Sequence, residues 1–383
     1  MKIAVLTSGR QDWGILRSTC IAIRDHGSLE LSLWSGGMHE HAAFGATAKD
    51  IEADGFTLHS RLPWFDGVDT SAAEQAARAL AKVADALAEH RPAALLLVGD
   101  RLETAAAALA ATLAATPIVH LHGGEETEGA FDNALRHAVT KLSHLHLVSH
   151  ERHAARVRAM GEDPATVHVV GAPGLDNLHR ADLPSREDLA RSLGIALDAP
   201  VVIVTLHPST LGGDPDVEAS ALATAMDQVP ASYVITLPNA DPGAAPIRRI
   251  LGEAGRKTGR VVVDALGERR YWGLMRIADA MLGNSSSAIV EAPALHLPAV
   301  NVGERQRGRE RGGNVVDVPA DAGAIASGLR QALSGELRAA SARVGAPFGD
   351  GDSAARIVEI LSRWQPPRPP RKSFFDGVGG GRR

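Results

Sequence analysis

The sequence predicts an α/β protein with two Rossmann-like domains that face a shared cleft. Three observations support this fold class. Short apolar strands alternate with Ala-rich helical stretches, the alternation begins again in the second half of the chain, and polar residues follow the strands in both halves. Near-continuous apolar strands joined by helices are typical of parallel sheets that are covered on both faces.

The first half of the chain contains apolar runs that predict strands and two clear helical patterns. We expect strands at 2–8, 29–35, 93–100, 116–123, 145–150 and 166–173, and helices at 71–90 and 131–144. Because strands that alternate with helices form βαβ units, these elements predict one parallel sheet. The first domain is therefore expected to comprise residues 1–174.

A Gly- and Pro-rich interruption at 171–184 marks the boundary, and the strand–helix pattern then begins again. Strands are expected at 200–208, 232–238, 260–266, 280–287 and 298–303. They predict a second domain over residues 175–350. A helix in 351–366 is expected to pack back on the first domain, and the tail 367–383, rich in Pro, Gly and Arg, is expected to be flexible.

Composition narrows the class of protein. The chain is 45% hydrophobic and 22% charged, with a formal net charge of −5, which argues for a globular protein and against broad nucleic-acid binding. Its single cysteine, Cys20, excludes an internal disulfide and a cysteine-based zinc cluster. The first residues enter a strand pattern directly, and no apolar run approaches the ~18 residues that span a bilayer. We therefore expect a cytoplasmic protein without a membrane partner.

Polar residues gather where the predicted strands end. They are Ser8–Arg10, Gly99–Arg101, His120–Glu125, His207, Pro238–Asp241 and Asn284–Ser287. Parallel sheets bind ligands at the carboxyl ends of their strands, so these residues predict a ligand cleft. No GxGxxG fingerprint follows the first strand and no GxxxxGK[ST] motif occurs, which disfavours a dinucleotide redox enzyme and a P-loop NTPase.

The serines of segment 282–293 stand where a helix should start after a predicted strand. Unpaired N–H groups at a helix start favour a phosphate. An ordinary serine N-cap explains the same residues equally well. Glu291, further along this helix, is suited to accept hydrogen bonds from ribose hydroxyls.

A Gly-rich loop at 303–314 follows the last predicted strand and is rich in arginine. Such a run forms a solvated basic surface or, at the ligand edge, neutralises a diphosphate. Arg10, after the first strand, is expected to reach the same anion from the other domain. The arginines of the loop are Arg305, Arg307, Arg309 and Arg311.

His207 and Asp100 both follow apolar strands. His207 has either a structural role or a role beside the candidate phosphate site. Asp100 is either paired with Arg101 or another cation, or tuned for proton transfer. His120 and His122 alternate along a predicted strand and should share a face. No HExxH or comparable spacing completes a ligand set, so we expect neither a catalytic metal nor another cofactor.

Ordered motifs along nearly the whole chain carry a resemblance to a known family. They are TSGRQDWGIL (7–16), GGMHEHAAFG (36–45), VGDRLE (98–103), HLHGGEETEGAFDNALRHAVTKLSHLHLVS (120–149), VGAPGLDN (170–177), LHPST (206–210), TLPNADPG (236–243), GNSSSAIVEAP (283–293), VNVGERQRGRERGGNVVDV (300–318) and RKSFFD (371–376). Together they resemble the UDP-N-acetylglucosamine 2-epimerases, specifically the hydrolysing branch of bacterial sialic- and legionaminic-acid pathways. The non-hydrolysing branch differs at HLHGGE and at the LHPST histidine.

The resemblance implies a glycosyltransferase-B type fold, with the sugar on the first domain and UDP held mainly by the second. It also implies a reaction without an external redox cofactor. UDP leaves by elimination across C1 and C2 to give a 2-acetamidoglucal. Water then adds at C1 and a proton at C2, which releases UDP and a free epimerised sugar such as N-acetylmannosamine.

Site residues are implied position by position. Asp100 and Asp132 match catalytic acids of the family, and His207 matches a histidine near the leaving diphosphate. The residues that match the UDP pocket and the phosphate and cleft motifs are Ser285, Ser286, Glu291, Arg305, Arg309, Arg10, Asn239 and Asp241.

The chain departs from the family pattern at a few positions. Some members carry an acid where this chain has His122, so the role of the acid falls to Glu125 or to His122 itself. Asn133 stands where a second acid often follows Asp132, and Trp272 replaces a smaller aliphatic residue. The sugar can therefore be a related hexosamine, a diacetamido sugar or a sugar of a specialised pathway.

Other functions remain as alternatives. A reversible, non-hydrolysing epimerase is the nearest. A glycosyltransferase of the same architecture would keep the diphosphate pocket, and a nucleotide-sugar sensor would have lost turnover. In each case the partner is a UDP-sugar and no nucleic acid, and we expect a homo-oligomer, either a dimer or a tetramer.

Overall fold

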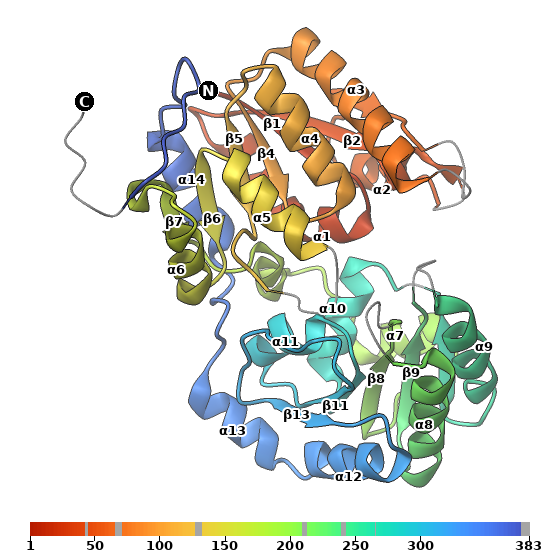
Figure 1. The fold of residues 1–383 in the computed structure, drawn as a ribbon. Helices are drawn as coiled ribbons and strands as arrows, with labels where there is room; N and C mark the ends of the chain where they lie inside the picture. Colours follow the sequence, from red (N-terminus) through yellow and green to blue (C-terminus); the bar gives the residue numbers. More distant parts are fainter. Residues whose placement is uncertain are drawn as a thin grey trace. The chain divides into compact units, whose positions relative to one another are not determined.

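The chain folds into two compact α/β units. A computed structural model describes residues 1–42, 45–65, 71–126, 132–208, 213–238, 243–264 and 266–376 (Figure 1). Within these limits, unit 1 comprises 1–125, 131–176 and 349–383, and unit 2 comprises 126–130 and 177–348. The predicted α/β class with two Rossmann-like parallel sheets is confirmed.

The described part of unit 1 contains a seven-stranded parallel sheet with the order β3-β2-β1-β4-β5-β6-β7. The strands are β1 (Lys2–Thr7), β2 (Glu30–Gly36), β3 (Ser60–Leu62), β4 (Ala94–Val98), β5 (Ile118–Leu121), β6 (Leu145–Val148) and β7 (Val167–Val169). Alternate residues serve opposite faces: Ile3 and Val5 enter one apolar cluster, whereas Ala4 and Leu6 enter another. The central strands are therefore apolar on both faces.

Helices cover both faces of this sheet (Figure 1). They are α1 (Arg10–Asp25), α2 (Ala48–Ala53), α3 (Ala72–His90), α4 (Leu102–Leu113), α5 (Asp132–Leu142), α6 (Glu151–Ala159) and α14 (Ser353–Arg363), with 3₁₀ turns at Gly37–Glu40, Pro164–Thr166 and Pro173–His179. Helices α3 and α4 pack on each other. On the other face α14 packs against α1, where Ile357 and Leu361 join the cluster of Leu16 and Cys20.

The C-terminal tail differs from the sequence-based expectation in its described part. Residues 367–376 were expected to be flexible, but they lie along unit 1. The backbone N–H of Phe375 donates to the carbonyl of Gly161 at 2.9 Å, and Lys372 contacts the end of α5. Polar and aromatic side chains thus anchor a segment whose Pro- and Arg-rich composition resembles that of a linker.

The described part of unit 2 contains a six-stranded parallel sheet with the order β10-β9-β8-β11-β12-β13. The strands are β8 (Val201–Thr205), β9 (Ser232–Thr236), β10 (Arg260–Val263), β11 (Ala280–Gly283), β12 (Ala299–Val302) and β13 (Val315–Val318). The helices are α7 (Arg186–Leu193), α8 (Pro215–Gln228), α9 (Ala244–Ala254), α10 (Glu268–Ile277), α11 (Ser287–Val290), α12 (Ala322–Leu333) and α13 (Glu336–Val344), with a 3₁₀ turn at Ala292–Leu295. None of the described helices is long and apolar enough to cross a membrane.

All expected strands are present, and two edge strands were missed. β3 is only three residues long, and β13 is half-exposed with Asp317 in its middle. Neither has the continuous apolar character of a buried strand, so neither produces a clear signal in the sequence.

Gly283 allows β11 to approach β8 closely. Its φ is +129°, and a Cβ atom there would lie 1.9 Å from the carbonyl oxygen of Thr205. Since only glycine tolerates this backbone conformation and this contact, the end of β11 depends on it.

We predict that Gly283→Ala lowers the free energy of unfolding by about 2 kcal/mol or more. The matched control is Gly252→Ala in α9, where the added methyl group meets nothing within 4 Å. That change should stabilise the protein by up to about 1 kcal/mol, because alanine favours a helix interior. Urea denaturation measures both, and a neutral Gly283→Ala would contradict the prediction.

Candidate functional site

The candidate site residues follow strands where the strand order of each sheet reverses. Ligands of open parallel sheets bind outside the carboxyl ends of the strands at such points. The order reverses between β1 and β4 in unit 1 and between β8 and β11 in unit 2. Ser8 follows β1, Asp100 follows β4, His207 follows β8 and Asn284 follows β11. Each unit therefore has its own candidate ligand edge.

In unit 1 Asp100 is paired with Arg136 of α5, not with Arg101. Arg136 is 3% exposed, and its guanidinium also donates to the carbonyl of Glu125 at 2.9 Å and to Asn133 Oδ1 at 3.0 Å. A buried guanidinium needs such partners because it cannot lose its charge. Asp100 therefore forms an ion pair with a cation other than Arg101, and its role in proton transfer stays a prediction.

His122 forms a dyad with Glu125. Its Nδ1 lies 2.6 Å from Glu125 Oε1, and Ser149 Oγ donates to the same carboxylate oxygen at 2.9 Å. His122 has φ +63°, and β5 ends before it, at Leu121. The prediction that His122 shares a strand face with His120 is therefore wrong.

The hydrogen bonds of this cluster define the tautomers. A carboxylate only accepts, so His122 Nδ1 carries the proton, and in the neutral ring Nε2 is an acceptor. His122 Nε2 is buried and has no hydrogen-bond partner among the described residues. Ser149 gives its single proton to Glu125, so the Nδ1–H of His153 donates to Ser149 Oγ, 3.0 Å away. Burial lowers the pKa of His153 to about 4, which keeps this ring neutral.

His120 is not available as a metal ligand. Its Nε2 bonds the carbonyl of Gly99 at 2.8 Å and its Nδ1 lies 3.3 Å from Thr140 Oγ1. Burial lowers the pKa of His120 to about 3. Both ring nitrogens are thus used to connect β5 to the loop after β4 and to α5.

Asp132 is the first residue of α5 and is half-buried. A negative charge is favourable at a helix N-terminus. Arg136 follows at position i+4, so both side chains project from the same face of α5. This face carries Asp132 and the cation that holds Asp100.

A second polar cluster surrounds the turn between β1 and α1. Arg10 is the exposed first residue of α1, and Asp12 accepts hydrogen bonds from the N–H and hydroxyl of Ser8 at 3.0 and 2.6 Å. His39 lies between Thr7 Oγ1 and a second threonine hydroxyl, at 2.9 and 2.7 Å. Burial lowers the pKa of His39 to about 4, and the charge of Arg10 adds to this effect.

In unit 2 the side chain of Asn284 fixes the backbone of His207. Its Oδ1 accepts from the His207 N–H at 2.7 Å and its Nδ2 donates to the His207 carbonyl at 2.9 Å. The Asn284 carbonyl accepts from Arg305 at 3.1 Å and from Gln306 at 2.8 Å. Burial lowers the pKa of His207 to about 4, and the charge of Arg305 contributes. Thus His207 is neutral at pH 7 and lies near a guanidinium.

The serine segment fits both of its interpretations in part. Ser285 Oγ accepts from the N–H of Ser287 at 3.3 Å, whereas Ser286, the N-cap of α11, makes no side-chain cap hydrogen bond. Helix α11 has only four residues, so the expected contribution of a helix dipole is small, and Glu291 ends this helix instead of lying two turns inside it. Tyr271, which sequence reasoning missed, lies near Ser285 and Ser287, and burial raises its pKa to about 12.

The arginines of the loop after β12 have different surroundings: some form ion pairs on the surface, and others lie near the turn after β11 or are half-buried. Arg307 forms an exposed pair with Glu304 at 2.7 Å, and Arg311 pairs with Asp317 at 2.9 Å. Arg305 lies at the ligand edge, and Arg309 is half-buried. The predicted cleft residues Asn239 and Asp241 lie outside the described residues.

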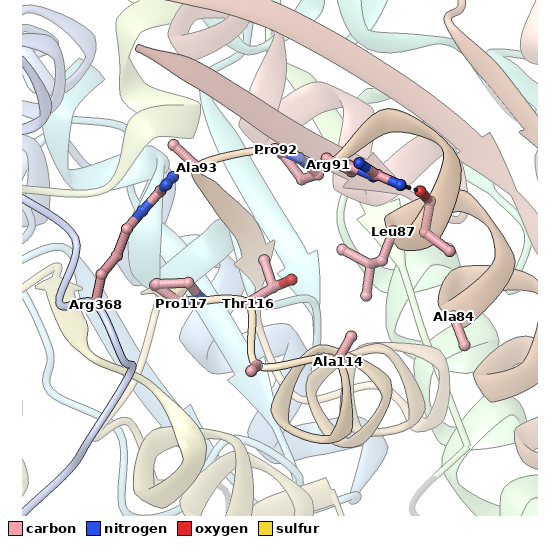
Figure 2. Close-up of a pocket in the computed structure, with 11 residues that line it drawn as sticks. Ala84, Leu87, Arg91, Pro92, Ala93, Ala114, Thr116, Pro117 and Arg368 are labelled. Atoms are coloured by element: carbon pink, nitrogen blue, oxygen red, sulfur yellow. Dashed lines mark hydrogen bonds between the residues drawn. The ribbon is translucent and has the colours of Figure 1, made fainter.

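A surface pocket of about 580 Å³ opens at the opposite edge of unit 1 (Figure 2). It lies where β4 and β5 begin, between the C-terminal ends of α3 and α4, with Arg91 and Arg368 among its residues. None of the candidate site residues lines it. Since parallel sheets bind ligands at the carboxyl ends of their strands, we do not assign it to the candidate site.

Comparisons with known proteins identify similar chains. A family model described as UDP-N-acetylglucosamine 2-epimerase matches residues 21–362. A GDP/UDP-N,N'-diacetylbacillosamine 2-epimerase (hydrolyzing) of Campylobacter jejuni is 34% identical, with 82% of this chain and 84% of the relative covered. A UDP-N,N'-diacetylbacillosamine 2-epimerase (hydrolyzing) of Legionella pneumophila is also 34% identical, over 94% and 95%.

A solved structure shows the same fold. The UDP-N-acetylglucosamine 2-epimerase of Neisseria meningitidis, bound to UDP-N-acetylglucosamine, superposes with a TM-score of 0.82 at 19% identity, and 94% of this chain and 99% of that chain are covered. This structural similarity confirms the predicted glycosyltransferase-B type of fold.

We predict that stability falls with acidification because His39, His153 and His207 are neutral when folded. Their folded pKa values of about 4 lie below the unfolded value of about 6.5, so the unfolded chain binds more protons between these limits. The free energy of unfolding should drop by about 1 kcal/mol per histidine for each pH unit below about 6. Urea denaturation between about pH 7 and 5 measures the slope, which His207→Gln should reduce by the share of one histidine, about 1 kcal/mol per pH unit; an unchanged slope would refute the assignment.

Proposed function

The chain belongs to the UDP-N-acetylglucosamine 2-epimerase family, and from this premise we propose that it is a hydrolysing UDP-sugar 2-epimerase. In this reaction the C2–H and C1–O bonds of the sugar break, a C1–C2 double bond forms, and the C1–O electron pair leaves with UDP. Water then supplies oxygen to C1 and a proton to C2. The products are UDP and the free C2-epimerised sugar.

The observation that supports this chemistry best is the His122–Glu125 dyad. Proton removal at C2 needs a base whose acceptor atom is oriented and not otherwise bonded. Glu125 fixes the Nδ1 proton of His122, and Nε2 has no partner among the described residues. We assign His122 as the group that takes the C2 proton, and Glu125 as the group that orients it and stabilises its protonated form. Because C2 is inverted, the new proton at C2 must come from a group on the opposite face of the sugar.

Asp100 and Asp132 are proposed to complete the sugar side. Arg136 holds the carboxylate of Asp100 in a defined position at the end of β4. Asp132 projects from the same helix as Arg136. Elimination and hydration each need a proton donor or acceptor on the other side of the reacting bond, and these carboxylates are suited to that role.

Unit 2 is proposed to bind UDP at the turn after β11. A leaving diphosphate gains negative charge, which the guanidinium of Arg305 and the donors of Ser285 and Ser286 would stabilise. The neutral His207 contributes a hydrogen bond and not a charge. Glu291, Arg309 and Arg10 remain predicted ligands of the ribose and phosphates, as do Asn239 and Asp241, which lie outside the described residues.

For the sugar we propose an N-acetylated hexosamine, with a 2,4-diacetamido sugar as the first candidate. The support comes from the two 34% identical relatives, whose names specify N,N'-diacetylbacillosamine nucleotides. A non-hydrolysing epimerase and a transferase remain the alternatives. The homo-oligomer, dimer or tetramer, and the cytoplasmic location stay predictions from the sequence; light scattering tests the first.

Isotope labelling tests the function. In deuterated, ¹⁸O-labelled water, UDP-N,N'-diacetylbacillosamine and UDP-N-acetylglucosamine are each offered, and products are identified by NMR and mass spectrometry. We expect UDP and a free sugar with deuterium at C2 and labelled oxygen at C1. An intact UDP-sugar with deuterium at C2 would support the reversible epimerase, and turnover only with an added acceptor would support a transferase.

Single substitutions test the proton-transfer groups. His122→Gln, Asp100→Asn and Asp132→Asn should each lower kcat by about a hundredfold or more, because each removes a group assigned to proton transfer. UDP affinity, measured by calorimetry, should change by less than about threefold, since the UDP site is assigned to unit 2. A variant with a near-normal rate would remove that residue from the mechanism.

Two arginines of one loop test the UDP site. Arg305→Ala should weaken UDP binding by about ten- to hundredfold, because it removes the guanidinium beside His207. Arg307→Ala is the matched control: its side chain forms an exposed pair with Glu304, and its loss should leave affinity unchanged. Equal effects of the two substitutions in calorimetry would argue against a diphosphate at Arg305.

A further inference from the structure

The C-terminal strap, defined as residues 370–376, docks on unit 1 along the end of α5. Its backbone bonds at both ends: the Pro370 carbonyl lies 3.4 Å from His144 Nε2, and the Phe375 N–H donates to Gly161 at 2.9 Å. The Phe374 ring lies so close to Gly161 that a Cβ there would be 2.3 Å from it. A glycine with φ +82° thus leaves room for the strap.

Lys372 of the strap caps the C-terminus of α5. Its ammonium donates to the carbonyls of Thr140 and Lys141, at 3.0 and 2.7 Å. The last four carbonyls of a helix lack partners within the helix and carry the negative end of its dipole. A lysine from more than two hundred residues further along the chain therefore supplies what a local C-cap usually supplies.

A buried carboxylate holds Lys372 in this position. Glu162 is 2% exposed, and it binds Lys372 at 2.7 Å, Lys141 at 2.6 Å and His146 Nε2 at 3.0 Å. Burial alone would raise the pKa of Glu162, but these hydrogen bonds and charges lower it to about 2. Removing Lys372 would take one donor from the carbonyls of Thr140 and Lys141, of which Thr140 keeps the N–H of Ser143 at 3.1 Å, and would leave the carboxylate with one cation fewer.

Helix α5 connects this anchor to the candidate catalytic groups. It begins at Asp132 and ends at Leu142, and Arg136 in its middle holds Asp100 and the Glu125 carbonyl. We propose that Lys372 is a positioning residue: through it the strap fixes α5, and with it Arg136 and the carboxylate of Asp100, in the geometry required for turnover. The catalytic part of this inference rests on the proposed function.

Three variants of the full chain test the proposal. Lys372→Met keeps the length of the side chain and removes the charge, and Lys372→Arg keeps the charge. Arg371→Met is the matched control, because Arg371 is the exposed cationic residue next to Lys372 in the sequence. A truncation after Pro370 removes the strap, and its control ends after Asp376.

We expect Lys372→Met and the truncation after Pro370 to lower kcat by about tenfold or more, since a small misplacement of a reacting group has a large effect. KM for the UDP-sugar and UDP affinity should stay within about twofold, because the UDP site is assigned to unit 2. Hydrogen exchange of the last α5 amides should accelerate by about tenfold or more. Lys372→Arg should recover much of the loss, and Arg371→Met and the chain ending at Asp376 should match wild type.

Two results would overturn the proposal. One is a Lys372→Met protein that unfolds at lower temperature but, where it is folded, turns over at the wild-type kcat. The other is unchanged α5 exchange in that variant. If the wild-type protein turns over no UDP-sugar, the proposed function fails, and the exchange measurement still decides whether the strap holds α5.

Discussion

The ion pair between Arg136 and Asp100 is the constraint on which the ligand edge of unit 1 depends. A guanidinium that is 3% exposed keeps its charge, so it must be surrounded by acceptors that do not move away. Here the acceptors come from the end of β4, the loop after β5 and α5 itself. One buried charge therefore joins three segments. It holds the side chain of Asp100 after β4 and the backbone of Glu125 after β5.

At the ligand edge of unit 2 an amide side chain fixes the backbone. The amide of Asn284 bonds both backbone groups of His207, and the Asn284 carbonyl receives two side chains from the loop after β12. An amide side chain can donate and accept at once, so it connects two strand ends with no net charge. The positive charge of Arg305 lies beside this turn, which suits a site for a diphosphate.

Much of the fold could be predicted from the sequence because buried parallel strands are apolar along most of their length, as in 94–98 and 201–204. The two edge strands that the sequence did not predict, β3 and β13, are short or half-exposed. For the site, strand ends identified which polar residues share an edge, since this follows from topology. The residues that contact them could not be predicted in this way, because they come from helices or from other strand ends. Only the folded chain brings Arg136 to Asp100, Ser149 to Glu125 and Tyr271 near Ser285.

The last residues of the chain belong structurally to its first unit. Helix α14 packs on α1, and Lys372 binds the end of α5, so the side of α1 that meets α14 is covered only after residues 353–363 have been made. Chains are synthesised from the N-terminus and usually fold in that order. In this protein the segment 177–348 can complete its own sheet while the earlier segment still waits for its covering helix. The order of synthesis and the order of completion are thus reversed for these two units.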